Sequence, residues 1–244
     1  MPNKGFSLVE LSIVLVILGL LIGGVLTGQN LIKAAELRSA TKEFEEWQTA
    51  VNMFKEKYLA LPGDMKNATA FWGAANVAGA GGECAAPGTN TGTGTQTCNG
   101  DGSGTVTTNA GLIAGAYTGV QGSGNSWDAD PGVNVPRGKI SNAGWMIWHY
   151  PNHPGDWLRF TSDNGQLLAY GANAGADWPY NPLLTPEEAW NIDTKMDDGK
   201  PGTGKLIAMQ WTPCTLATAF TDITADFDFT VKTPAYSLAF RKVF

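Results

Sequence analysis

Residues 4–10 read Lys-Gly-Phe-Ser-Leu-Val-Glu, and an almost unbroken apolar run follows them as far as Ile32. About 20 apolar residues are enough for a helix to cross the hydrocarbon core of a bilayer. Between Phe6 and Ile32 the only ionisable side chain is Glu10, near the start. A lone carboxylate in hydrocarbon costs roughly 2.5 kcal/mol or more and normally marks a function with a nearby partner. The sequence therefore predicts a membrane-crossing helix with a functional acid near its beginning.

A cut between Gly5 and Phe6 would supply a positive partner for Glu10. It would leave an α-amino group on Phe6 that is cationic below a pKa of about 8. That charge can neutralise Glu10 in the same chain or in a neighbour packed alongside. The alternatives are a secretory signal ending near residues 34–35 and a plain membrane anchor. A secretory signal has a shorter apolar region, and neither alternative explains the Gly-Phe-x-x-x-Glu spacing.

This arrangement resembles the class III leader of type IV prepilins and of the pseudopilins of type II secretion. In that family a membrane peptidase cuts after the glycine and N-methylates the phenylalanine, and the carboxylate guides subunit docking. The resemblance therefore implies cleavage after Gly5, N-methylation of Phe6 and an assembly role for Glu10. It is strong over the first sixty residues and patchy beyond them.

The overall composition narrows the function classes further. The net charge of −6 and the scattered basic residues argue against nucleic-acid binding through a basic patch. Two histidines leave little material for nucleophilic catalysis, so we do not expect an enzyme. A membrane-crossing N-terminus would put the rest of the chain outside the cytoplasm, where disulfides persist.

The apolar helix is predicted to continue to about Ala60, because no proline occurs between Pro2 and Pro62. Its outer half carries a heptad stripe of apolar residues, and most charged residues are assigned to the other faces. The stripe fits a coiled coil with another helix, or packing on the chain's own globular domain, which the pilin resemblance implies. The stripe consists of Leu37, Ala40, Phe44, Trp47, Val51, Phe54 and Tyr58, and the charged residues are Lys42, Glu43, Glu45, Glu46, Lys55 and Glu56.

The residues after the long helix are rich in turn formers. The sequence of residues 61–64, Leu-Pro-Gly-Asp, stops the helix, and Asp64 can cap a short second helix reaching about Ala75. Residues 78–126 are dominated by Gly, Thr, Ala, Asn and Ser, so we expect a long loop.

The cysteines and one Asn/Asp/Ser motif lie in or near this loop. Cys84 and Cys98 can close a small disulfide loop, with Cys214 as a competing partner for either one. Asn99, Asp101 and Ser103 place oxygens at alternate positions, as calcium loops do, but Ala110 stands where a carboxylate is expected. A turn-rich linker is therefore an equal alternative to a calcium site.

The carboxy-terminal half contains short β-like runs bounded by Gly, Pro, Asn or Asp. An antiparallel sheet covering the outer half of the long helix is the economical architecture, which predicts an α+β fold. The runs are residues 139–149, 157–161, 166–170, 206–211, 227–231 and 236–240.

One short helix and an acidic loop interrupt these runs. Thr185-Pro-Glu-Glu188 has a Thr cap, Pro at the first helical position and a capping-box Glu. Asp193, Asp197 and Asp198 follow, and three carboxylates so close repel one another unless a cation or hydrogen-bond donors absorb the charge. Because pseudopilins often hold calcium in a carboxy-terminal loop, the resemblance makes these three residues candidate calcium ligands; a solvated acidic turn is the alternative.

The sequence is interpreted as a leader (residues 1–5), a transmembrane or filament-core helix (6–32), an amphipathic helix (33–61) and a globular head (62–244). The resemblance implies a structural subunit of a type IV pilus-like filament, first in the inner membrane and then outside the cytoplasm. Its partners would be membrane lipid, the prepilin peptidase, an assembly platform with its ATPase, and other copies of itself. A type II secretion pseudopilin and a membrane-tethered binding module, the latter acting on glycans through tryptophans, are the alternatives.

Overall fold

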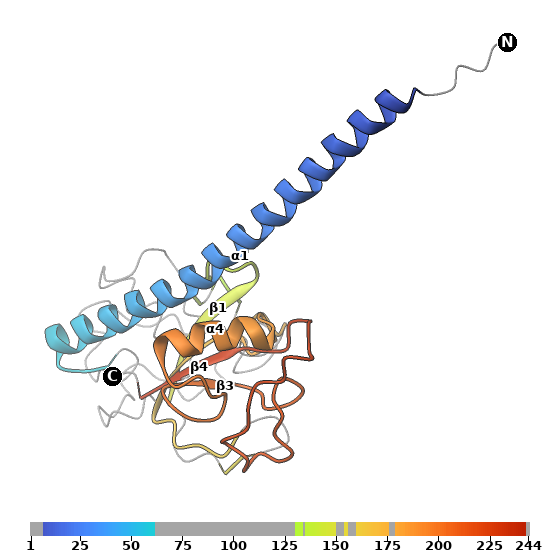
Figure 1. The fold of residues 1–244 in the computed structure, drawn as a ribbon. Coiled ribbons are helices and arrows are strands. Elements are labelled where there is room, and N and C mark those ends of the chain that lie inside the picture. Colours follow the sequence, from blue (N-terminus) through green and yellow to red (C-terminus); the bar gives the residue numbers. More distant parts are fainter. Residues whose placement is uncertain are drawn as a thin grey trace.

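The computed structural model describes residues 7–61, 130–133, 135–149, 154–155, 160–175 and 179–242. A long helix projects from a head that contains a four-stranded antiparallel sheet (Figure 1). The expected α+β class is therefore confirmed. In chain order the elements are α1 (Leu8–Tyr58), β1 (Ala143–His149), β2 (Gln166–Ala172), α4 (Pro186–Met196), β3 (Leu206–Ala208) and β4 (Leu238–Arg241).

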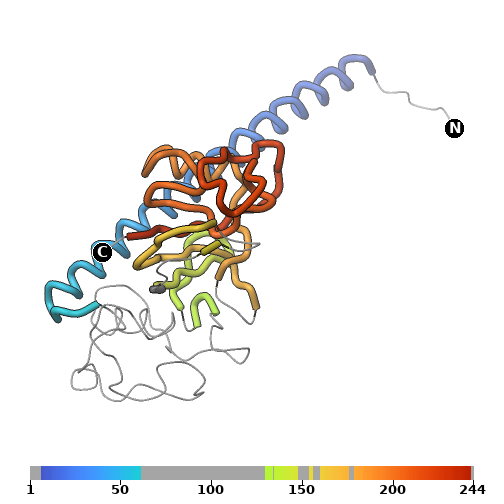
Figure 2. Tube along the Cα trace, turned by 90° about the horizontal axis from the view of Figure 1, so that it is seen from below, coloured from blue at the N-terminus to red at the C-terminus, as the bar shows by residue number. Residues whose placement is uncertain are grey.

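Helix α1 runs for 51 residues without a break, which corresponds to about 77 Å. It ends where Leu59 takes a left-handed conformation (φ 54°) and donates its N–H to the Lys55 carbonyl at 2.9 Å. Figure 2 shows the blue amino-terminal half projecting beyond the head and the cyan half lying along it. One continuous helix therefore has two different surroundings.

The sheet has the strand order β1-β2-β4-β3, with every neighbouring pair antiparallel. Side chains alternate between its two faces, as the period of two in a strand requires. Trp145, Leu168 and Phe240 belong to the face that packs against α1. Met146, Leu167 and Ala239 belong to a second buried cluster on the other face. The sheet is therefore buried on both sides, and only one of those sides holds the helix.

The outer half of α1 packs on this sheet through the predicted stripe. Ala40, Trp47 and Val51 are buried in the same core as the strands. Phe44 stacks on Phe240 of β4, with ring centroids 4.0 Å apart. Packing on the chain's own domain is thus confirmed over a coiled coil within the described part of the chain.

The strand bounds differ from the predicted runs. β1 starts at Ala143 rather than Lys139, because Asn142 is left-handed (φ 64°) and Ala143 closes a turn onto Ile140. β3 stops at Ala208, since the chain then enters the turns around Pro213. The run 166–170 is confirmed and extends to Ala172. The run 236–240 is also a strand, β4, shifted by two residues at its start and one at its end.

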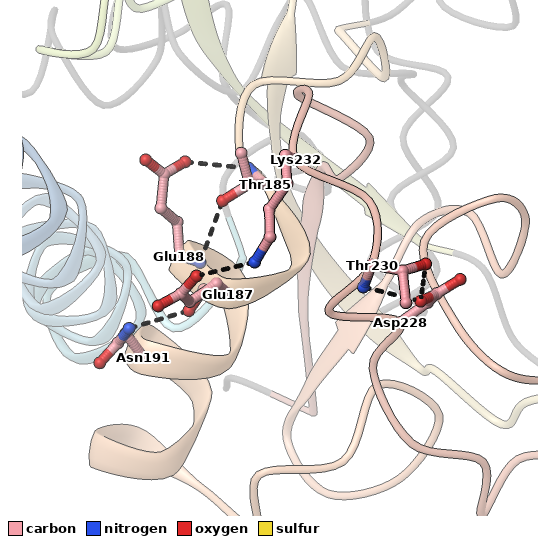
Figure 3. A network of polar contacts seen from close by, with 7 residues as sticks. All are labelled: Thr185, Glu187, Glu188, Asn191, Asp228, Thr230 and Lys232. Atoms are coloured by element: carbon pink, nitrogen blue, oxygen red, sulfur yellow. Dashed lines mark hydrogen bonds and ion pairs between the residues drawn. The ribbon is translucent and has the colours of Figure 1, made fainter.

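The strand predicted for residues 227–231 was wrong. Phe227 makes a single bridge to Thr215, and the chain then turns. Asp228 accepts hydrogen bonds from the Thr230 N–H at 2.9 Å and from its hydroxyl at 2.6 Å (Figure 3). This side-chain turn competes with the strand pattern, as Asp favours. Of the run 157–161, Phe160 and Thr161 are not in a strand, and its first three residues lie outside the described part.

The second helix expected after Asp64 and the Gly/Thr-rich stretch 78–126 also lie outside the described residues. The helix predicted at Thr185 is confirmed as α4, with both hydrogen bonds of its capping box present.

Replacing Phe240 by Ala is expected to lower the free energy of unfolding by about 3–5 kcal/mol, because it empties the space between α1 and the sheet. Phe229, 44% exposed, is the matched control, and its replacement by Ala should cost less than about 1 kcal/mol. Urea unfolding of the full-length protein in detergent, followed by tryptophan fluorescence, measures both. Equal losses in the two variants would contradict this packing.

Candidate functional site: the amino-terminal helix and its junction with the head

Helix α1 begins with a capping box. The Ser7 hydroxyl accepts from the Val9 N–H at 3.3 Å, and the Glu10 carboxylate accepts from the Ser7 N–H at 2.8 Å. A carboxylate in the first turn also interacts favourably with the helix dipole. In the uncleaved chain Glu10 therefore has a local hydrogen-bond donor. Within the described residues it forms no ion pair.

The segment from Leu11 to Ile32 is exposed along almost its whole length. Its best 18-residue window has a mean hydropathy of 2.6, so by length and composition this part of α1 can cross a membrane. Its two hydroxyls are satisfied inside the helix: Ser12 donates to the Val9 carbonyl and Thr27 to the Gly23 carbonyl, each at 2.9 Å. Apart from the amides of Gln29 and Asn30 near its end, the surface of this segment is therefore apolar.

The junction between α1 and the head contains a buried carboxylate. Glu43 is only 7% exposed. One of its oxygens accepts the Lys139 N–H at 2.9 Å, and the other accepts the Trp145 indole N–H at 3.3 Å. These bonds link the middle of the helix to the chain just before β1 and to β1 itself.

The placement of Glu43 on an outer face was wrong. Glu43 follows Ala40 by three residues and precedes Trp47 by four, so it lies on the stripe itself. That spacing is the signal that sequence reasoning missed. Burial raises the pKa of Glu43, while the hydrogen bond from Trp145 opposes the rise. Burial and the nearby Glu43 carboxylate also raise the pKa of Tyr170.

The acidic residues at the end of α4 come together as the sequence suggested. Oxygens of Asp193, Asp197 and Asp198 lie within 4.8 Å of one another. Asp197 accepts the backbone N–H of Leu206 at 2.9 Å and also that of Lys205. A side chain at Gly204, which has a φ of 70°, would collide with Asp197. The loop thus closes tightly around these carboxylates.

The three acids differ in their surroundings. Asp193 is 2% exposed, and Asp198 is exposed. Burial raises the pKa of Asp193 to about 8, the Gly199 N–H at 3.2 Å opposes the rise, and Asp198 and Asp197 add to it. Asp193 therefore holds its proton more strongly than an exposed aspartic acid does, and a nearby cation would favour its charged form. Asp198 accepts from the Lys200 N–H at 2.9 Å and from the Thr203 hydroxyl at 2.6 Å.

The other predicted site residues are placed as follows. Gly5 and Phe6 lie outside the described residues, as do Asn99, Asp101 and Ser103 of the second calcium candidate and the pair Cys84–Cys98. Cys214 is a free, buried thiol that donates to the Gln210 carbonyl at 2.7 Å. The competing disulfides through Cys214 are therefore not formed in this structure.

Comparison with known proteins identifies the start of the chain. The model of the prokaryotic N-terminal methylation motif matches residues 1–26. No curated protein and no solved structure matches the chain. The chain thus carries a class III leader, as type IV pilins and pseudopilins do, at the head of a helix apolar enough to anchor a precursor in a membrane. The motif points to a pilin-like structural subunit that the prepilin peptidase processes.

Replacing Glu43 by Ala should lower the free energy of unfolding by about 2–4 kcal/mol, because it leaves two buried N–H donors without an acceptor. Glu45, exposed on the same helix, is the control, and its replacement by Ala should change stability by less than about 0.5 kcal/mol. Urea unfolding in detergent measures both. A Glu43→Ala protein as stable as the parent would show that the junction does not need this carboxylate.

Proposed function

We propose that the protein is a structural subunit of a type IV pilus-like filament. It is made as a single-pass inner-membrane precursor with its head outside the cytoplasm, cleaved after Gly5, N-methylated at Phe6 and polymerised through α1. The observation that carries this proposal is the methylation motif at residues 1–26, continuous with a helix whose apolar half stays exposed. Such a surface is not left in water.

The covering of that apolar half changes as the subunit assembles. Lipid surrounds it in the precursor, and other copies of the same helix replace the lipid in the filament core. A side chain at Gly19, Gly23, Gly24 or Gly28 would meet nothing within 4 Å in the single chain. These glycines leave room for neighbouring helices to approach closely. The assembly platform and its ATPase supply the work of extraction from the membrane.

Glu10 has a double role in this scheme. In the precursor its carboxylate caps α1 through Ser7. After cleavage, the Phe6 amino group of the same or a neighbouring subunit neutralises it inside the filament. An unpaired carboxylate in the filament core costs free energy. The favoured register between subunits is therefore the one that pairs the Glu10 carboxylate with a Phe6 amino group.

A pseudopilin of a type II secretion system is the second candidate. Its leader is of the same class, and the acidic loop after α4 favours it, since the family resemblance links carboxy-terminal calcium loops to pseudopilins. Extracellular filaments seen in sheared material support the pilus; a filament confined to the periplasm supports the pseudopilus. A mature protein that keeps Met1 and never polymerises would support the membrane-tethered binding module instead.

Both Glu10→Ala and Glu10→Gln are expected to be cleaved and methylated normally but to reduce filament yield at least about tenfold, the effect of roughly 1.4 kcal/mol in assembly. Gln can still accept the Ser7 N–H in a capping box, so the pair of variants separates the charge from the cap. Electron microscopy of sheared material and mass spectrometry of the N-terminus are the measurements. Normal filaments with Glu10→Gln would refute the charge-pairing role.

Calcium binding at Asp193, Asp197 and Asp198 is proposed for either kind of filament. Calcium bonds oxygens at about 2.3–2.6 Å, so ligand oxygens on opposite sides of the ion lie up to about 5 Å apart. The spacing within 4.8 Å fits that requirement. A bound dication would offset two of the three negative charges that converge here and hold the loop 197–206 against α4. The second candidate at Asn99, Asp101 and Ser103 rests on its sequence pattern alone.

Saturating calcium is expected to raise the melting temperature of the full-length protein by several degrees, since a ligand at about 100 times its Kd adds roughly 2.7 kcal/mol. Asp198→Asn should remove most of this increase, because it deletes a charged ligand and keeps an acceptor for Lys200. Asp163→Asn, at an exposed ion pair with Lys242, is the control and should keep the increase. Equal calcium responses in the two variants would place the ion elsewhere.

A further inference from the structure

The outer half of α1 has a second face, on the side of the helix away from the sheet. At 3.6 residues per turn, Lys42, Glu45 and Glu46 point away from the side that carries Trp47 and Val51. Trp47 and Val51 are buried, whereas these three charged side chains are exposed. Figure 2 shows the outer half of the helix lying along the head. The head therefore covers one side of α1 and leaves this charged face bare.

The three charges on this face are not paired within the chain. In the part of the chain that the structure describes, Lys42, Glu45 and Glu46 form no ion pair. Lys42 precedes the two glutamates by three and four residues, and a lysine placed before its glutamate is the weaker arrangement within one helix. The face thus presents one cation followed, one turn further along the helix, by two anions.

The same order of charges occurs at the start of the mature chain. In the proposed filament the Phe6 amino group of one subunit lies beside Glu10 of its neighbour. These residues are four positions apart, which is about 6 Å along a helix. Identical subunits related by one screw operation are displaced along the filament by the same amount at every residue. A displacement that brings Phe6 level with Glu10 therefore shifts every later residue by four positions as well.

This displacement brings opposite charges together on the outer half of α1. Lys42 of one subunit becomes level with Glu46 of the next, and it lies within about 1.5 Å of the level of Glu45. Parallel copies without the displacement would instead place like charges side by side. The charges of this face are therefore complementary to those of a second copy that is shifted by four residues.

We propose that the outward face of α1 binds a second copy of this chain, through ion pairs between Lys42 of one subunit and Glu45 and Glu46 of its neighbour. A second copy is the occupant because the face continues the apolar half of the same helix, which neighbouring copies cover in the proposed filament. The inference rests on the proposed function for polymerisation and for the register that pairs Phe6 with Glu10.

These ion pairs would fix the register of the subunits at a second point. Lys42 lies 36 residues after Phe6, which corresponds to about 54 Å of helix. A subunit displaced by one further helical turn would place Lys42 near the level of Thr49 and lose the attraction. An exposed ion pair contributes little by itself, but this contact recurs at every subunit of a filament.

Charge-reversal variants of the full-length chain, expressed with its assembly machinery, test this inference. Lys42→Glu should lower the yield of sheared filaments about fivefold or more, because it replaces attraction by repulsion at each contact. Glu45→Lys combined with Glu46→Lys should have the same effect. All three substitutions in one chain exchange the two signs, so they should restore the yield to within about twofold of the parent.

Lys55→Glu is the matched control for these variants. Lys55 is also exposed on α1, but Tyr58 and Leu59 stand three and four residues after it. No acid therefore occupies the corresponding positions of the shifted neighbour, and the yield should stay within about twofold of the parent. Urea unfolding in detergent should be unchanged in the variants at positions 42, 45 and 46, since no ion pair within the described chain is lost.

Zero-length carbodiimide cross-linking gives a second measurement that needs no substitution. Filaments from cells shifted between ¹⁴N and ¹⁵N medium contain subunits of both labels. Mass spectrometry of their digests should find amides that join Lys42 to Glu45 or Glu46, with one label on each side of the bond. Cross-links that always carry a single label would assign the pair to one helix.

Filaments of Lys42→Glu at the parental yield, or cross-links with a single label only, would overturn the inference. So would a failure of the triple exchange to restore filaments, in a variant whose urea unfolding is unchanged. A parent chain that is methylated but never assembles refutes the proposed filament and the pairing with it. A parent that assembles without these effects refutes only the pairing.

Discussion

The contact between the outer half of α1 and the sheet is the interaction on which the rest of the molecule depends. It combines an aromatic stack, Phe44 on Phe240, with a buried carboxylate that ties Glu43 to β1. The stack buries apolar area, and the hydrogen bonds fix the position of the helix along the strands. Because the helix is continuous, the same contact joins the head rigidly to the segment that would lie in a membrane or filament. A force applied to the apolar half is therefore transmitted to the head.

The two halves of α1 are suited to two different environments. From Leu11 to Gly28 the helix is apolar on all sides, with its hydroxyls bonded back to its own carbonyls. Beyond Lys33 it is apolar on one face only. The change occurs within a single turn, at the position where Lys33 of α1 pairs with Glu188 of α4. The boundary between the two environments thus lies at the position where α1 meets α4.

Three acidic side chains of the protein are stabilised in different ways. Glu10 is at a helix end, where the dipole and a backbone donor support it. Glu43 is buried with two N–H donors. Asp193 is buried with one, and its pKa is raised to about 8. Glu10 is available to a partner, and Glu43 is needed for the packing of α1 on the sheet. Asp193 would be stabilised most by a bound cation. These differences follow from the burial of each carboxylate together with the number of donors around it.

Sequence alone determined the leader, the span and its length, the apolar stripe of α1 and the cap of α4, because these depend on residues close together in the chain. It did not give the burial of Glu43, since only the approach of Trp145 from about a hundred positions away makes a carboxylate on that stripe acceptable. It also misplaced the strand expected at residues 227–231, where Asp228 bonds to Thr230 in a turn. Tertiary structure decided the strand order and the contact between α1 and α4. The physical reason is that the strand order and the helix contact depend on which distant segments bury one another. The spacing of residues close together in the sequence does not determine that pairing.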